Sequence, residues 1–91
     1  MKIEEHILKF SHTIKSVTGL HGRAAAKIVE KCKEFNSTVS VVYNGKIGNA
    51  NSVVSLVSIE AKQDDVVNVI IEGADEVLAY NSLKSYFKEN L

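Results

Sequence analysis

The stretch LKFSHTIKSVTGLHGRAAAKIVEKCKE, residues 8–34, changes its hydrophobic period once, and that change decides the fold. Its first part alternates apolar and polar residues, as a half-buried strand does, with one face made of Leu8, Phe10, His12 and Ile14. After Gly19, residues 22–34 show the spacing of an amphipathic helix, whose apolar positions are Ala25, Ile28, Val29 and Cys32. The segment therefore predicts a strand, a glycine turn and a helix, with His21 at or next to the helix N-cap.

A hairpin and a second, short helix are expected next. Residues 38–43 are β-branched or aromatic, Asn44-Gly45 suits a two-residue turn at positive φ, and residues 46–48 form a short return strand. The following apolar run, VVSLVSI, fits a strand or a helix by composition. A polar stripe at a spacing of three favours a helix over residues 52–59; the stripe consists of Ser52, Ser55 and Ser58.

The last third predicts one more strand and a final helix. Residues 66–71, VVNVII, are apolar on both faces, as a central strand is. Gly73 ends this run, and Asp75 and Glu76 place negative charge in the first turn of the helix. The buried stripe of that helix is expected to be Ala79, Tyr80, Leu83, Tyr86 and Phe87. The order βαββαβα indicates an α+β fold, with a four-stranded antiparallel or mixed sheet and the helices on one face.

Composition narrows the class of protein. The chain of 91 residues has no linker-like segment, so we expect a single domain over residues 1–91. Eleven basic residues balance eleven acidic ones without a long block of either sign, which disfavours nucleic-acid binding. A single cysteine, Cys32, and an N-terminus without signal-peptide order favour the cytoplasm, and no run is long enough to insert in a membrane.

His21 and Arg23 are the residues with chemical potential. The first turn of a helix presents unpaired N–H groups and partial positive charge, which suit an anion. A neutral imidazole there offers a nitrogen lone pair to an incoming phosphoryl group, and the fork of Arg23 neutralises phosphate oxygens. On local sequence alone, such a pair is more often a capped, solvated helix start than a phosphate site. Nothing else in the segment is a catalytic group, so the machinery for transfer would come from partner proteins.

The residues Thr18-Gly19-Leu20-His21-Gly22-Arg23 resemble the active-site signature of HPr, the histidine-containing phosphocarrier family of the bacterial sugar phosphotransferase system. Further landmarks keep the same spacing without insertions, and they are Phe35, Tyr43-Asn44-Gly45-Lys46, Ser52 and Gly73-Ala74-Asp75-Glu76. The family fold is an open-faced β-sandwich of order βαββαβα. The resemblance leaves residues 1–7 as an N-terminal extension.

The resemblance implies a phosphoryl carrier rather than an independent enzyme. His21 would accept phosphate on Nδ1 from enzyme I and pass it to sugar-specific enzyme II permease components, with Arg23 and the backbone of Gly22 and Arg23 holding it. Ser52 resembles the regulatory serine that a kinase/phosphorylase modifies, which links the family to a transcriptional regulator and to carbon catabolite regulation. The helix after Ser52 resembles the partner-docking helix, and its candidate contact residues are Val53, Val54 and Val57. No cofactor and no metal are expected.

Two departures and one alternative stay open. The family usually has proline where this chain has Ala24, and Gly22 is not the usual residue between the histidine and the arginine. Proline presets φ in the first turn, so Ala24 is expected to hold the site less firmly. The alternative is a regulatory binding module switched at Ser52 without a carrier role. His6 and His12 have no partners at metal-ligand spacing and are expected to be structural or solvated.

Overall fold

The computed structural model describes residues 7–91, so His6 and all but the last residue of the predicted N-terminal extension lie outside the described residues. Seven elements follow one another along the chain: β1 (Ile7–Thr13), α1 (Gly22–Cys32), β2 (Ser37–Tyr43), β3 (Lys46–Asn49), α2 (Val53–Val57), β4 (Val66–Gly73) and α3 (Glu76–Asn90). This is the predicted order βαββαβα. Because β1 begins at Ile7, that residue belongs to the sheet and not to an extension.

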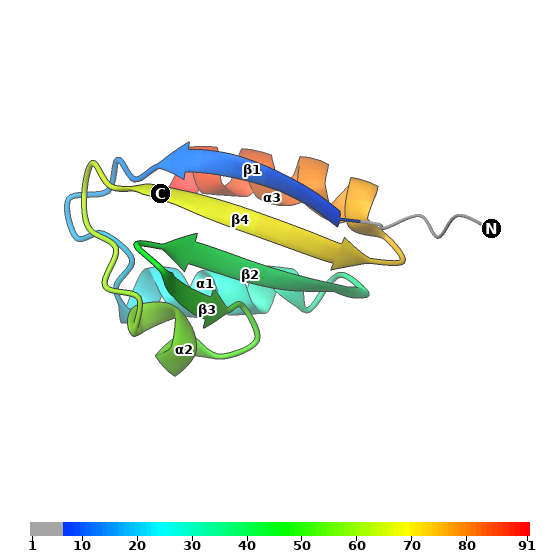
Figure 1. Cartoon of the computed structure of the whole chain (residues 1–91), viewed down its shortest axis with the longest axis horizontal. Helices are drawn as coiled ribbons and strands as arrows, with labels where there is room; N and C mark the ends of the chain where they lie inside the picture. Colours follow the sequence, from blue (N-terminus) through cyan, green and yellow to red (C-terminus); the bar gives the residue numbers. More distant parts are fainter. Residues whose placement is uncertain (1–6) are drawn as a thin grey trace.

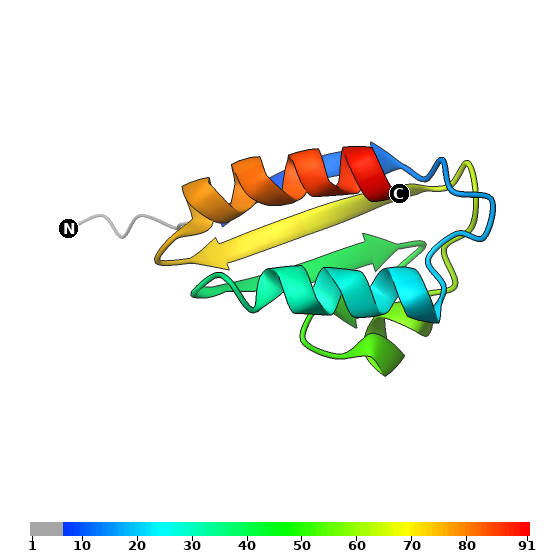
Figure 2. The ribbon, with the colours of Figure 1, turned by 180° about the vertical axis from the view of Figure 1, so that it is seen from behind.

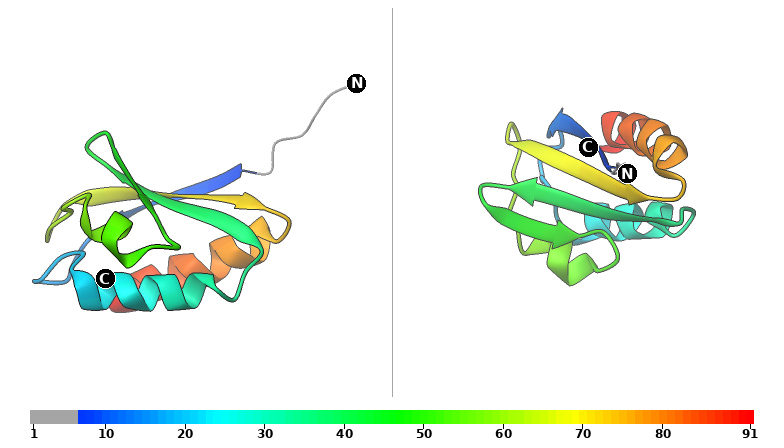
Figure 3. Two further views of the ribbon diagram at one scale, coloured as in Figure 1. Left: turned by 90° about the horizontal axis from the view of Figure 1, so that it is seen from below. Right: turned by 45° about the vertical axis from the view of Figure 1, so that its right-hand side comes forward.

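The four strands form one antiparallel sheet in the order β1-β4-β2-β3 (Figure 1). All three helices lie on the same face of this sheet (Figure 2). Figure 3 shows the sheet and the helices as two layers. In the register, Val69 of β4 lies opposite Phe10 of β1 on one side and Val41 of β2 on the other. The α+β class and the helices on one face are therefore confirmed, and the sheet is antiparallel.

The core lies between the sheet and the helices. Strand β4 is central, as predicted, and its inward residues Val67, Val69 and Ile71 are buried. The other face of β4 is not covered by any element of residues 7–91, so Val66 is 51% exposed and Ile70 is half-buried. Apolar residues on both faces of β4 thus reflect its central position in the strand order rather than burial on both sides.

Both short helices end earlier than the sequence predicts. Helix α1 stops at Cys32, two residues before the expected end, because residues 33–35 tighten into turns; the N–H of Phe35 donates to the carbonyl of Cys32 at 3.2 Å. Helix α2 covers Val53–Val57 instead of 52–59. Its first predicted residue, Ser52, is the extended N-cap, and Glu60 adopts a left-handed φ of 58°, which stops further winding.

Asp75 has a different role from the one that its position predicts. Its carboxylate makes no capping bond to α3 but accepts hydrogen bonds from the N–H of Asn36 at 2.8 Å and from the hydroxyl of Ser37. These two donors lower the pKa of Asp75. The contact ties the start of α3 to the start of β2, far from the site that His21 belongs to.

Candidate functional site

His21 is held at the start of α1 by the loop before it. Gly19 has a left-handed φ of 66°, and the buried Leu20 donates its N–H to the carbonyl of Ala61 at 3.0 Å. His21 is the N-cap, with extended backbone, and its Nδ1 accepts the N–H of Arg23 at 3.2 Å. The ring is therefore half-exposed at the surface, and its Nδ1 lone pair points at the first-turn amides.

An open depression of about 80 Å³ surrounds this ring. Its lining comes from the loop after β1, from α1 and from the end of α3, and consists of Ser16, His21, Arg23, Ala24, Lys27, Ile28, Tyr86, Asn90 and Leu91. The structure thus brings His21 and Arg23 together, as the sequence predicts. It also adds residues that the sequence reasoning missed, because α3 reaches the site only through the tertiary fold.

The end of α3 fixes the loop that leads to the site. The carbonyl of Leu91 accepts the N–H groups of both Lys15 and Ser16, the latter at 3.0 Å, and Leu91 itself is buried. Asn90 is anchored in turn, since its side chain donates to the carbonyl of Tyr86 at 3.0 Å. No local signal in the sequence indicates this long-range contact.

The charge around the ring is positive. The first turn of α1 contains no acidic residue, and Arg23 and Lys27 both line the depression. Within residues 7–91, neither of these two side chains forms an ion pair. The site therefore combines a nitrogen lone pair, first-turn amides and two cations outside any ion pair of residues 7–91, an arrangement that favours a multiply charged anion.

Helix α2 lies beside the N-terminal half of α1 (Figure 2). Ser52 caps α2, since its Oγ accepts the N–H of Ser55 at 3.2 Å. Val54 is 79% exposed and Val57 is 37% exposed, whereas Val53 is partly buried against the core. An exposed apolar pair next to the site is typical of a contact surface. Val17, in the loop before the site, is 82% exposed and was not singled out from the sequence.

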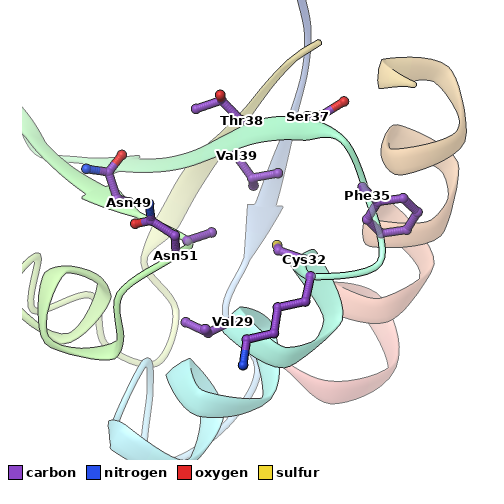
Figure 4. A pocket seen from close by; sticks show the side chains of 10 residues that line it. Val29, Cys32, Phe35, Ser37, Thr38, Val39, Asn49 and Asn51 are labelled. Atoms are coloured by element: carbon purple, nitrogen blue, oxygen red, sulfur yellow. The ribbon is translucent and has the colours of Figure 1, made fainter. Parts of the chain in front are cut away.

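A second hollow, of about 270 Å³, shares no residue with the His21 depression. It lies at the other end of α1, where Val29 and Cys32 face Val39 of β2 (Figure 4). Burial raises the pKa of the Cys32 thiol to about 11, so the thiolate is scarce near neutral pH. Cys32 is therefore a partly buried residue packed against the core rather than an activated nucleophile.

His12 is also apart from the site. Its ring meets that of Phe87 edge to face at 5.6 Å, and its Nε2 is buried without a hydrogen-bond partner. Burial lowers the pKa of His12, the backbone of Leu91 opposes that shift, and the charge of Lys15 adds to it. No cluster of three or more metal-ligating side chains occurs in residues 7–91, and no helix in that range is long and apolar enough to cross a membrane.

Comparisons with known proteins agree on one family. The family described as the PTS HPr component phosphorylation site matches residues 8–89. The phosphocarrier protein HPr of Xylella fastidiosa (strain Temecula1) is 33% identical over 82 residues, which cover 90% of this chain and 92% of that protein. HPr of Mycoplasma pneumoniae is 31% identical over 83 residues, covering 90% and 94%.

Solved structures give the same result. HPr-C-His from Thermoanaerobacter tengcongensis superposes with a TM-score of 0.84 at 32% identity and covers 91% of this chain and 93% of its own. The catabolite repression protein Crh of Bacillus subtilis superposes with a TM-score of 0.73, also at 32% identity, and covers 88% and 92%.

Proposed function

The chain belongs to the HPr family of phosphoryl carriers of the phosphotransferase system, and from that premise we propose that His21 is the residue that carries the phosphoryl group. The observation that carries the proposal is the position of His21 as N-cap of α1, with Nδ1 3.2 Å from the N–H of Arg23. In this contact Nδ1 is the acceptor, and it faces the first-turn donors that a phosphoryl group needs.

The transfer step follows from this geometry. The Nδ1 lone pair attacks phosphorus, a new N–P bond forms, and the bond between phosphorus and the donor breaks with its electron pair leaving on the donor. The N–H of Arg23 loses Nδ1 as acceptor in that step and becomes free for a phosphoryl oxygen. Passing the group to the next acceptor reverses these events. The protein acts as a relay, and its partners supply the remaining catalytic groups.

Arg23 and the first-turn amides hold the phosphoryl group in this proposal. The Arg23 guanidinium offers a planar set of donors at the rim of the depression, and the N–H groups of Gly22 and Arg23 lie in the first turn of α1, where the helix dipole favours negative charge. Gly22 adds no steric barrier, since a Cβ built on it meets nothing within 4 Å. A partner can therefore approach the ring closely from that side.

The exposed side of α2 is the proposed docking surface. Val54 and Val57 are exposed on α2, whereas Val53 is partly buried against the core. The partners proposed for this surface are enzyme I and the sugar-specific enzyme II components, in the cytoplasm. Burying two such valines against a partner supplies apolar contact area next to His21 without changing the core.

Ser52 is the proposed regulatory site. Its hydroxyl caps α2, and a phosphate there adds up to about two negative charges at the edge of the docking surface. A kinase/phosphorylase is the partner that this role requires. The likeness to Crh, a catabolite repression protein, favours a regulatory binding module as a second candidate function. In that role we propose that phosphorylated Ser52 binds a transcriptional regulator. Loss of that binding in Ser52→Ala, with no effect of His21→Ala, would favour this second role.

The carrier role is tested by incubating the purified protein with phosphoenolpyruvate and enzyme I. We expect one phosphoryl group per chain, labile to acid and stable to base. His21→Ala is expected to abolish the adduct, and His12→Gln is the control because His12 lies outside the depression. An adduct that survives His21→Ala contradicts the assignment.

A further inference from the structure

Helix α1 carries an unfavourable pair of charges next to His21. Arg23 and Lys27 are four residues apart, so they are neighbours on one helix face, and like charges at this spacing destabilise a helix. Both are exposed, both line the His21 depression, and that depression contains no carboxylate side chain among the described residues. Within residues 7–91, neither of the two side chains takes part in an ion pair.

The other lysines of this helix and its end are compensated. Lys31 pairs with Glu34 at 3.2 Å and lies over the Tyr86 ring at 5.8 Å. Lys33 pairs with Glu30 at 3.4 Å and lines the hollow at the far end of α1. Lys27 differs from both lysines, because its ammonium group has no carboxylate partner in residues 7–91 and can interact with a ligand in the depression.

The direction of helical side chains places the Lys27 charge toward the site. The Cα–Cβ bonds of a helix tilt toward its N-terminus, so the stem of Lys27 leans over the turn that begins at Arg23. Tyr86 and Ile28 border the same depression. Lys27 and Arg23 thus line the same depression from successive turns of α1.

We propose that Lys27 is a second phosphate-binding residue of the His21 site, which acts together with Arg23. The inference rests on the proposed carrier role of His21. Arg23 supplies directional donors, whereas Lys27 supplies a mobile point charge that neutralises part of the phosphoryl dianion. The repulsion between the two cations in the unphosphorylated protein is relieved when the anion arrives, which shifts the transfer equilibrium toward phosphorylated His21.

Two measurements on the same variants test this inference. The first is the equilibrium constant for phosphoryl transfer from phosphorylated enzyme I, measured at low and high salt. The second is the dissociation constant of inorganic phosphate, followed by the amide NMR shifts of Arg23 and Ala24. The variants are Lys27→Gln, Lys27→Arg and Lys33→Gln, where the last is a matched control that removes the same charge at the other end of the helix.

We expect Lys27→Gln to lower both the transfer constant and the phosphate affinity by about twofold to fivefold at low salt, the range of an exposed charge pair. Lys27→Arg is expected to stay near the parent, and so is Lys33→Gln. Equal effects of Lys27→Gln and Lys33→Gln would overturn the inference. If His21 takes no phosphate from enzyme I, the carrier proposal fails, but the phosphate titration still decides whether Lys27 binds the anion.

Discussion

The two glycines that flank His21 are expected to respond in opposite ways to the same substitution. Gly19 has a φ of 66°, and a Cβ built there lies 2.7 Å from the carbonyl oxygen of Ala61 and 2.9 Å from Cα of Lys62. Both neighbours are backbone atoms and cannot turn aside as a side chain would. Gly22 is the first helical residue of α1, and a Cβ there meets nothing within 4 Å.

The magnitudes follow from these contacts. In Gly19→Ala, the left-handed backbone costs about 1–2 kcal/mol, and the clash requires the loop before His21 to move away from residues 61–62. We expect a total loss of about 2–4 kcal/mol in the free energy of unfolding. In Gly22→Ala, the helical conformation suits alanine, and the lower entropy of the unfolded chain stabilises the fold by about 0.4–1 kcal/mol.

Denaturant unfolding followed by circular dichroism measures both changes, and phosphorylation by enzyme I reads out the site. Gly19→Ala is expected to lower Tm by about 10 °C or more and to slow phosphorylation, because the loop positions His21. Gly22→Ala is expected to raise Tm and to keep the phosphate site intact. A stable Gly19→Ala variant, or a destabilised Gly22→Ala variant, would refute the description of the loop and of the helix start.

Three further outcomes are expected. Ala24→Pro is expected to raise stability by up to about 1 kcal/mol in thermal unfolding. The first i to i−4 bond of α1 is donated by the N–H of Ala25, so a proline at position 24 removes no helical hydrogen bond. A large loss of Tm would count against this description of the first turn. Because the pKa of His12 is lowered in the fold, the unfolded chain takes up the proton first as the pH falls below about 6.5. Stability therefore drops below that pH, and His12→Gln is expected to flatten this part of the pH profile of Tm. Parallel profiles for the variant and the parent would exclude His12 as the cause. Val54→Glu is expected to raise KM for enzyme I with Tm unchanged, and the equally drastic Val77→Glu on α3, 61% exposed, is the control; equal KM values would place docking elsewhere.

The strand and helix order was predictable because local periodicity carries it. Alternation in residues 8–14 and helical spacing after Gly19 follow directly from backbone geometry, and His21 falls at the N-cap as predicted. The ends of α1 and α2 were less predictable. Tertiary contacts and turns decide where these helices stop. The left-handed backbone of Glu60 could not be predicted, because glutamate is not a residue type that favours this conformation.

The composition of the site was only partly predictable. His21 and Arg23 are close in sequence, so their meeting follows from the helix start alone. Tyr86 and Leu91 reach the depression from α3, and only the antiparallel sheet order brings that helix beside α1. The sequence did contain a signal for Lys27, since it follows Arg23 by four residues. This spacing indicates two like charges on one helix face, but it does not indicate that this face borders His21.

The measurement that tests the central claim most directly identifies the ring nitrogen that carries phosphorus. The protein is labelled with ¹⁵N, phosphorylated by enzyme I and phosphoenolpyruvate, and examined by long-range ¹H–¹⁵N and ³¹P NMR. We expect phosphorus on Nδ1 of His21, with a large shift of the Arg23 amide as its hydrogen bond passes from the ring nitrogen to a phosphoryl oxygen. Phosphorus on Nε2, on another residue, or on Nδ1 with an unmoved Arg23 amide would contradict the account.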